Sequence, residues 1–421
     1  MKLFLRTSIA LAITICCLSS YAQEASVVKH NLFYGTTRIG GETNSGAILK
    51  IASDSTAEAV FDFTHKARAP FGDNGFTLGP DGLLYGMTYY GGSSDGGIVI
   101  SIDPSTGAVE ERVDLVSPYA YRPTGKFMLT STNKLYSNSV RLFEFDPSTD
   151  ELSYLANTSN YAVGTPVEGP DGTIYGMTYN RGTNSKGSIF SVDPSTGVLV
   201  DLHSFSTESG GYSPYGSLTY YNGFLYGYTR YGGINNVGVV FKYEISTQSY
   251  LELADLSTDK ASNPIYGKFS LTESGNLIAP SFYGGNPGGY GTIFGVNTST
   301  DEVDTLYRFK QTEISITGGQ PIGEFAKSPG EDIYYGTARY GGTNTKGVIY
   351  KFDLSDSSLT VLYHFTEEIG EPYSSLYLYN NELYGMTNSG GANSHGTVFK
   401  YNITSETITK LKDFEGAANG F

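Results

Sequence analysis

The sequence predicts an all-β protein, a β-propeller of seven to eight four-stranded blades. Three observations lead to this fold class. A short phrase recurs along the chain with a period of about 50 residues, each copy of the repeat contains four short strand patterns, and the 421 residues include 53 glycines and 35 tyrosines. Abundant glycine and tyrosine favour short strands joined by tight turns over helices.

The repeated phrase is Leu-Tyr-Gly-x-Thr-x-x-Gly-Gly, followed four residues later by a glycine and an apolar-apolar-aromatic run. The glycine after the tyrosine serves as a marker, and serine or alanine replaces it in two weaker copies. The markers are Gly35, Gly86, Ser137, Gly176, Gly227, Ala279, Gly336 and Gly385, at spacings of 51, 51, 39, 51, 52, 57 and 49 residues. Eight copies fill residues 23–421, so we expect one repeat domain there.

Each copy contains four strand patterns, called a to d in chain order. In the copy marked by Gly176 we expect them near residues 164–167, 173–178, 188–192 and 198–202. The turns a–b and c–d read Pro-Asp-Gly and Asp-Pro-Ser-Thr-Gly, in which proline presets φ and glycine accepts a positive φ. Four antiparallel strands at this period are typical of a propeller blade. A helical solenoid would need a 3.6-residue periodicity that is absent.

The phrase also identifies a family resemblance. Tyr-Gly-x-Thr, then Gly-Gly-x4-Gly, Thr-Val-Phe-Lys at 397–400 and Leu-x-x-Phe at 202–205 resemble the bacterial GloVer tandem repeat over nearly the whole chain after residue 22. The resemblance implies secretion and a propeller-like array, and it brings no catalytic residue. Two copies depart from the pattern: the one at Tyr136 lacks the Gly-Gly loop, and the one at Ile278 continues Ala-Pro-Ser-Phe.

The kelch repeat is a related alternative, since it has a similar period and a Gly-Gly pair after the second strand. Kelch blades also use a tryptophan, and this chain has none. The same absence argues against propellers that bind a quinone cofactor, because tryptophans join their blades.

The N-terminus predicts a secretory signal peptide at residues 1–22. Lys2 and Arg6 precede an apolar run at 9–15, and Ser20-Tyr21-Ala22 places small residues before the expected cleavage point. A lipoprotein signal is the alternative, although the residues before Cys16 match it poorly. Both cysteines lie in this segment, so we expect no disulfide or thiolate chemistry in the mature chain. We therefore expect a secreted or cell-surface protein without a transmembrane segment in its mature chain.

The C-terminal residues 414–421 follow the last strand pattern and then stop. Either this tail helps to close the ring, or the sequence ends before a further blade or a sorting domain. The sequence favours the second interpretation slightly, because elsewhere the same stretch continues into a new strand a.

The sequence predicts no catalytic residue, metal site or cofactor. The five histidines form no paired metal motif, and no Gly-x-Ser-x-Gly is present. Acidic pairs such as Glu110-Glu111 could serve a glycosidase, but we interpret them as solvated turns. An aspartate recurs at one position of the repeat, as Asp103, Asp146, Asp193 and Asp353. We interpret it as a turn residue, with calcium binding as the alternative. A net charge of −15 excludes nucleic acid as a natural partner.

The best candidate for a binding site is a column of arginines and tyrosines at the third and fourth residues after the marker. In a propeller the b–c and d–a loops share one face, and here they are the longer and more variable loops. The column comprises Arg38, Tyr89, Tyr90, Tyr179, Arg230, Tyr231, Phe282, Tyr283, Arg339 and Tyr340. The d–a loops add Tyr119, Tyr121, Arg122, Tyr212, Tyr215, Tyr266 and Tyr373. Both residue types are favoured at protein interfaces, and tyrosine also stacks on sugars; alternatively, these rings wedge between blades.

These observations predict an exported, non-catalytic propeller that binds a protein or glycan at the cell surface. One alternative is a carbohydrate hydrolase or lyase that uses the same face. The other is a purely structural or adhesive repeat. A catalytic site should break the repeat where several blades converge, whereas a scaffold should show only features shared by all copies.

Overall fold

The computed structural model describes the backbone of four N-terminal strands, at residues 22–29, 32–37, 47–51 and 57–62, and residues 75–414 except 118–119, 159–161, 208–209 and 286–287. The chain divides into two compact units, residues 1–66 with 417–421 and residues 67–416, and each is described by itself. Residues 1–21 of the expected signal peptide, Arg38 and Tyr119 lie outside the described residues.

The first repeat copy forms an antiparallel sheet of four strands in chain order. Its marker glycine, Gly35, pairs with Ala25 on the first strand and with Leu49 on the third, which is the register expected for strand b. The strands are β1 (Ala22–Lys29), β2 (Leu32–Thr37), β3 (Ala47–Ile51) and β4 (Ala57–Asp62).

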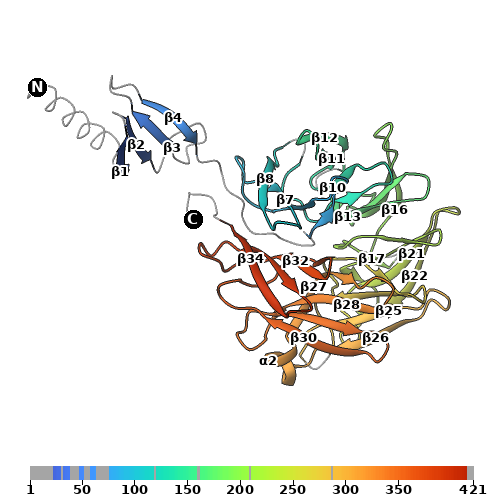
Figure 1. Ribbon diagram of the computed structural model, residues 1–421. Helices are drawn as coiled ribbons and strands as arrows, with labels where there is room; N and C mark the ends of the chain where they lie inside the picture. Colours follow the sequence, from blue (N-terminus) through green and yellow to red (C-terminus); the bar gives the residue numbers. More distant parts are fainter. Residues whose placement is uncertain are drawn as a thin grey trace, which may run out of the picture. The chain divides into compact units, whose positions relative to one another are not determined.

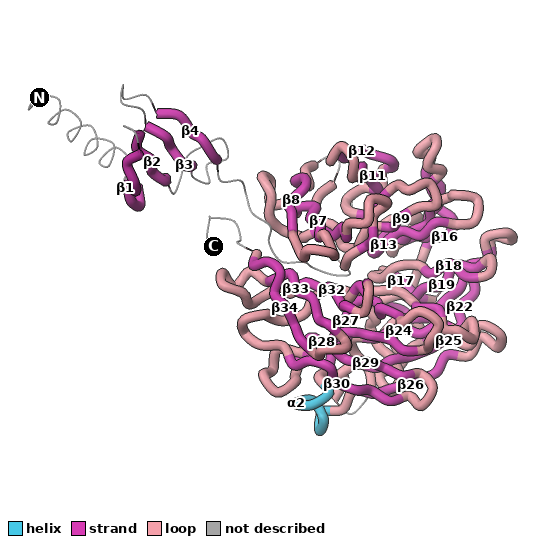
Figure 2. The backbone as a smooth tube through the Cα atoms, in the orientation of Figure 1, coloured by secondary structure: helices cyan, strands magenta, loops and turns pink. Residues whose placement is uncertain are grey.

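The second unit is a β-propeller of seven four-stranded antiparallel blades (Figure 1). Figure 2 shows that its described residues are almost entirely strand and loop. Blade 1 contains β5 (Thr77–Leu78), β6 (Leu84–Met87), β7 (Ile98–Ile102) and β8 (Val109–Asp114). Blade 2 contains β9 (Met128–Leu129), β10 (Leu135–Asn138), β11 (Leu142–Asp146) and β12 (Glu151–Ala156). Blade 3 contains β13 (Ala162–Glu168), β14 (Ile174–Thr178), β15 (Ser188–Val192) and β16 (Leu199–Ser204).

The remaining four blades follow the same order. Blade 4 contains β18 (Thr219–Tyr221), β19 (Phe224–Tyr228), β21 (Val239–Glu244) and β22 (Ser249–Asp255). Blade 5 contains β23 (Ser270–Leu271), β24 (Leu277–Ser281), β25 (Thr292–Val296) and β26 (Val303–Arg308). Blade 6 contains β27 (Gly319–Lys327), β28 (Ile333–Tyr340), β29 (Val348–Asp353) and β30 (Ser358–His364). Blade 7 contains β31 (Tyr377–Tyr379), β32 (Glu382–Met386), β33 (Thr397–Asn402) and β34 (Thr407–Asp413).

Four short elements of the described residues lie outside the four-stranded sheets of the blades. The strands β17 (Gly211–Tyr212) and β20 (Tyr231–Gly232) form a small sheet between loops. Between blades 5 and 6, the inserted residues form a 3-10 turn, η1 (Gln311–Glu313), and one helical turn, α2 (Ile314–Thr317).

Blade 2 is shorter because only residues 139–141 connect its second and third strands, as the missing Gly-Gly loop predicts.

The marker glycine makes room for an aromatic ring of strand c. Gly227 pairs directly with Phe241, and a Cβ atom at Gly227 would lie 2.6 Å from the Phe241 ring. An aromatic side chain that covers a glycine on the neighbouring strand helps to fix the register of the pair. The same pairing occurs at Gly176–Phe190, Gly336–Tyr350 and Gly385–Phe399.

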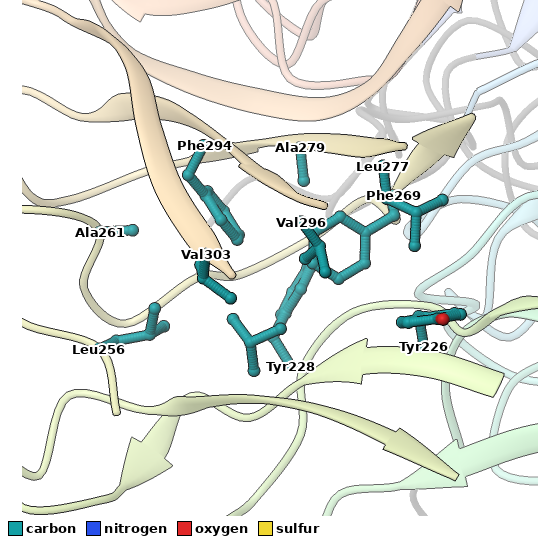
Figure 3. Packing of buried hydrophobic residues seen from close by; sticks show 11 residues of the cluster. Tyr226, Tyr228, Leu256, Ala261, Phe269, Leu277, Ala279, Phe294, Val296 and Val303 are labelled. Carbon is teal, nitrogen blue, oxygen red and sulfur yellow. The ribbon is translucent and has the colours of Figure 1, made fainter. Parts of the chain in front are cut away.

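Aromatic side chains fill the space between neighbouring blades. Figure 3 shows this packing between blades 4 and 5, where Tyr228 meets Phe269 and Phe294. The ring centroids of Tyr228 and Phe269 are 5.5 Å apart, and those of Phe269 and Phe294 are also 5.5 Å apart. Edge-to-face pairs at such distances stabilise a core beyond the area they bury.

Blades 1 and 7 close the ring by side-chain contacts. Phe76 of blade 1 packs with Tyr384 and Met386 of blade 7 in one buried cluster, and Lys412 Nζ lies 3.0 Å from a Glu111 carboxylate oxygen. Each blade of the described ring consists of four strands that are consecutive in the chain, apart from β20 within blade 4. Seven of the eight predicted copies therefore make the ring, and the first copy forms a sheet in the other unit.

Candidate functional site

The b–c and d–a loops meet on one face, here called the loop face. In blade 4 the backbone of Tyr212, from the d–a loop, pairs with that of Tyr231, from the b–c loop. In blade 5 the Ser262 amide donates to the Tyr283 carbonyl over 3.1 Å. These contacts place Tyr212 beside Tyr231 and the loop between blades 4 and 5 beside Tyr283.

A repeated threonine holds the b–c loops of blades 1, 4 and 7 in shape. The Thr229 hydroxyl donates to the Tyr231 carbonyl over 2.9 Å, and it accepts from the Val239 amide over 3.1 Å. Thr229 is fully buried, so these bonds replace water that cannot reach it. Thr88 and Thr387 make the same pair of bonds in blades 1 and 7.

The end of strand d fixes the tip of the same loop. In blade 4 the Ile234 amide donates to Asp255 Oδ1 over 2.7 Å, and Asn235 Nδ2 donates to the Leu256 carbonyl over 2.9 Å. Corresponding tip bonds end on Asp114, Ser204, His364 and Asp413. Both histidines near the ends of strands d have structural contacts here, since His364 accepts from the Thr343 amide and His203 stacks on Tyr250.

Four tyrosines form a row across the loop face: Tyr179, Tyr215, Tyr266 and Tyr373. Their successive ring centroids are 5.5, 5.3 and 6.1 Å apart. Tyr266 and Tyr373 are only 6% and 7% exposed. Burial is the main cause that raises the pKa of Tyr266, and hydrogen bonds with the Tyr373 and Tyr215 hydroxyls raise it further. Tyr266 therefore stays neutral at physiological pH.

Two predicted arginines lie over tyrosines of this row, one over its second ring and one over its last. The Arg230 guanidinium is 5.5 Å from the Tyr215 ring centroid and 5.0 Å from that of Tyr231. The Arg339 guanidinium is 4.8 Å from the Tyr373 ring centroid. Cations placed over aromatic faces in this way are attracted by the ring quadrupole, and their N–H groups can still reach an acceptor.

The predicted residues of blade 1 form a second group. Tyr89 and Tyr90 pack against each other with centroids 4.7 Å apart, and the Arg122 guanidinium is 4.9 Å from the Tyr90 ring. Arg122 also pairs with Asp95 over 3.2 Å. Its charge is therefore already balanced by a neighbouring carboxylate.

Exposure separates the predicted residues into two sets. Phe282 is 4% exposed and packs with Tyr266 in a buried cluster. This agrees with the alternative interpretation, in which the ring packs between blades. Tyr283 and Tyr340 are 40% and 49% exposed. Ile234, at the tip of the blade 4 loop, is 88% exposed. Sequence reasoning missed Ile234, although other copies have Ser93, Thr183, Thr343 and Ala392 at this position.

Sequence reasoning also missed charges at the propeller axis. Lys126 of blade 2 and Lys268 of blade 5 both pair with Glu324 of blade 6, with Lys268 Nζ 3.4 Å from the carboxylate. Lys126, Lys268 and Glu324 each follow a glycine that lies just before or within the innermost strand of the blade. Thr165, Ser217 and Ser375 occupy the equivalent positions in blades 3, 4 and 7. A charged residue at this repeat position, where other copies have threonine or serine, is the sequence signal that could have identified the ion pairs.

The opposite face, here called the turn face, is built from the tight a–b and c–d turns. Asp103 Oδ1 accepts from both the amide and the hydroxyl of Ser105, over 2.8 and 2.6 Å. These bonds hold the pKa of Asp103 below its usual range, and the bond from the Ser105 hydroxyl has the largest effect. Asp146, Asp193 and Asp353 make the same bonds, which shows the predicted turn role. A polar cavity of about 380 Å³ lies on this face between turns of blades 1 and 7.

Within the part of the chain that the structure describes, no three His, Cys, Asp or Glu side chains are grouped so that they could hold a metal ion. In that same part, no helix has the length and apolar character needed to cross a membrane.

Solved structures with a similar fold include several enzymes. Virginiamycin B lyase from Staphylococcus aureus is 14% identical with a TM-score of 0.54, covering 74% of this chain and 90% of that one. Oligogalacturonate lyase from Vibrio parahaemolyticus is 12% identical with a TM-score of 0.51, covering 90% of this chain and 98% of that one. A puromycin-hydrolyzing peptidase from Mycobacterium tuberculosis is 13% identical with a TM-score of 0.52, covering 84% and 57%. Such identities show a shared fold alone.

No curated protein sequence matches the chain. The profile described as the Gloeobacter/Verrucomicrobia repeat matches residues 119–286 and 256–421. These two overlapping matches cover well over half of the chain and contain blades 2 to 7, with the marker phrase, the buried threonine and the strand-end acceptors described above. The chain belongs to the Gloeobacter/Verrucomicrobia repeat family.

Proposed function

We propose that this protein is an exported, non-catalytic binding protein that recognises a macromolecule at the cell surface through the loop face of blades 4 to 6. Six residues define this area, which we call the Arg/Tyr surface: Arg230, Tyr231, Ile234, Tyr283, Arg339 and Tyr340. The observation that carries the proposal is that exposed apolar side chains occur there beside two arginines that have no carboxylate partner among the described residues.

Exposed apolar side chains support this choice of area. Ile234 and Tyr283 are exposed on the b–c loops of blades 4 and 5, and Tyr340 is exposed at the end of β28 in blade 6, where the b–c loop begins. Ile316, in the insertion before blade 6, is 60% exposed, and the Ile314 carbonyl accepts from the Gly342 amide over 2.9 Å. Grouped apolar side chains on a soluble protein commonly mark an interaction site.

The two arginines supply polar recognition. Neither Arg230 nor Arg339 pairs with a carboxylate among the described residues, whereas Arg181 on blade 3 pairs with Asp201 over 2.9 Å. Arg230 Nε is buried and has no hydrogen-bond partner among those residues. An unpaired buried donor costs free energy unless a ligand satisfies it, and arginine with tyrosine is frequent at binding hot spots.

Export rests on the N-terminal pattern of Lys2, Arg6, the apolar run and Ser20-Tyr21-Ala22. The mass of the protein with its N-terminus intact or cleaved after Ala22, measured on secreted material, tests this part. Protein that stays in the cytoplasm at full mass would contradict it.

The binding part is tested with a glycan array and a pull-down of cell-surface proteins. Wild type is compared with an Arg230→Ala/Tyr231→Ala variant, and Arg181→Ala, which removes a paired arginine on the same face, is the control. We expect the double variant to lose interactions that the control retains. If the folded double variant keeps every interaction, the Arg/Tyr surface is the wrong site, and turnover of a polysaccharide by purified protein would contradict the non-catalytic claim.

A further inference from the structure

We infer that the Arg/Tyr surface binds an acidic segment of a partner protein, with carboxylates of that segment on Arg230 and Arg339 and its apolar side chains on Ile234, Tyr283 and Tyr340. The inference rests on the proposed function, and it adds the class of partner and the groups that recognise it.

The surface is continuous across blades 4 and 5. Asn263 Nδ2, in the loop between these blades, donates to the Arg230 carbonyl over 3.0 Å. The neighbouring Ser262 amide donates to the Tyr283 carbonyl over 3.1 Å. One short loop therefore joins the backbone of Arg230 to that of Tyr283.

The surface continues from blade 5 to blade 6. The Gln320 amide donates to the carbonyl of Tyr290, which lies in the same b–c loop as Tyr283, over 2.6 Å. Gly319 pairs with Tyr340 on the neighbouring strand. These contacts fix the loops of three blades to one another, so a partner would meet an area with little freedom to rearrange, which lowers the entropy cost of binding.

The charges of this area favour carboxylates. A guanidinium group offers a planar set of donors that matches a carboxylate in bidentate fashion. Arg230 and Arg339 lie over tyrosine rings instead of beside acidic groups.

The rest of the molecule disfavours the same ligand. The net charge is −15, and the turn face carries an aspartate in four blades, Asp103, Asp146, Asp193 and Asp353. An acidic segment is repelled by these aspartates, whereas Arg230 and Arg339 have no carboxylate partner among the described residues. Complementary charge of this kind mainly determines where and in which orientation a partner docks.

The apolar side chains favour a protein over a glycan. Ile234 and Ile316 are 88% and 60% exposed, and an aliphatic side chain gains most when it is covered by other apolar groups. A polysaccharide can stack on Tyr283 and Tyr340 but covers an isoleucine poorly. Aromatic and arginine side chains are enriched at the centres of protein interfaces.

The test uses the full chain and a phage-displayed library of random peptides. We expect selected peptides to be enriched in Asp and Glu beside an apolar or aromatic residue. In fluorescence anisotropy, Arg230→Gln and Arg339→Gln should each weaken binding by about tenfold or more. Ile234→Asp should have a similar effect, and because Ile234 is so exposed the variant should keep wild-type stability. Arg181→Gln, whose arginine is already paired, should bind within about twofold of wild type.

Selected peptides that are neutral or basic, or that bind equally to Ile234→Asp and wild type, would overturn the inference. A library that yields no binder would overturn it as well. A glycan that binds wild type but not Arg230→Ala/Tyr231→Ala, in the absence of any acidic peptide binder, would overturn the inference and leave the proposed function standing. If neither glycan nor protein binds, both fail.

Discussion

Lys126 of blade 2 forms an ion pair with Glu324 of blade 6 across the axis of the propeller. Blades 7 and 1 lie between these two blades on one side of the ring, and blades 3, 4 and 5 lie between them on the other. Both side chains are largely buried, with exposed fractions of 13% and 5%. Charges taken out of water in this way depend on each other, because neither is solvated once its partner is lost.

Replacing Glu324 with glutamine should lower the free energy of unfolding by about 3 kcal/mol, since it removes the carboxylate that pairs with the buried Lys126 ammonium. Urea denaturation measures the change. The double variant Lys126→Met/Glu324→Met should recover most of the loss, because it removes the two buried charges together and the third charge, on Lys268, is 35% exposed. Lys412→Met, which breaks the more exposed pair with Glu111, should cost less than about 1 kcal/mol. Equal losses for Glu324→Gln and Lys412→Met would contradict the buried-pair interpretation.

Gly227→Ala should destabilise blade 4 by about 1–3 kcal/mol, because the added Cβ would lie 2.6 Å from the Phe241 ring and 3.0 Å from Leu218 Cδ2. Thermal denaturation measures the effect. Adding Phe241→Leu to Gly227→Ala should cost less than the sum of the two single changes, since the smaller side chain makes room for the methyl group. Additive losses would show that the ring of Phe241 is not the obstacle.

His203 should make the protein less stable as the pH falls. Its imidazole stacks on Tyr250 with ring centroids 4.0 Å apart, and burial lowers its pKa from 6.5 to about 4. Between pH 6.5 and 4 the unfolded chain takes up a proton at this residue and the folded chain does not, so acid favours unfolding. Because the ring is partly exposed, we expect a loss of about 1–2 kcal/mol over this range.

The variant His203→Phe keeps an aromatic ring against Tyr250 and cannot titrate. Urea denaturation at pH 7 and at pH 4 should show a smaller decrease in stability for this variant than for wild type. Parallel decreases for the two proteins would mean that other groups carry the pH dependence.

A chain that begins at Ala67 should fold into the same seven-bladed ring. The contacts that close the ring, among Phe76, Tyr384 and Met386 and between Lys412 and Glu111, all lie within residues 75–414. Its main cooperative transition should occur within about 3 °C of that of the full chain, as followed by far-UV circular dichroism and calorimetry. A truncated protein that aggregates or unfolds without cooperativity would show that the ring needs the N-terminal unit.

The sequence predicted the blades well because the repeat encodes local chemistry. The turns with proline and glycine, the marker glycine opposite an aromatic residue and the buried threonine each depend on residues close in sequence or paired across one hairpin. The strands expected in the copy of Gly176 lie within two residues of β13 to β16 at every boundary.

Relationships across the ring were harder to predict. The pairing of Lys126 with Glu324 joins residues about 200 positions apart, and no local pattern shows which blades face each other. Similarly, repeat counting gave eight copies, but whether seven or eight close a ring depends on how blades 1 and 7 pack. Among the predicted binding residues, Phe282 and Tyr283 are neighbours in sequence, but Phe282 is buried and Tyr283 is exposed.

The way in which blades 1 and 7 meet has an evolutionary consequence. Because no described blade of the ring takes a strand from the opposite end of the chain, a whole copy can be duplicated or deleted in the gene without leaving a blade incomplete. Phe76 and Tyr384 come from copies with the same internal pattern, so a newly added copy presents a similar closing surface. Lineages can thereby change the number of blades in single steps, and an array longer than one ring remains compatible with folding.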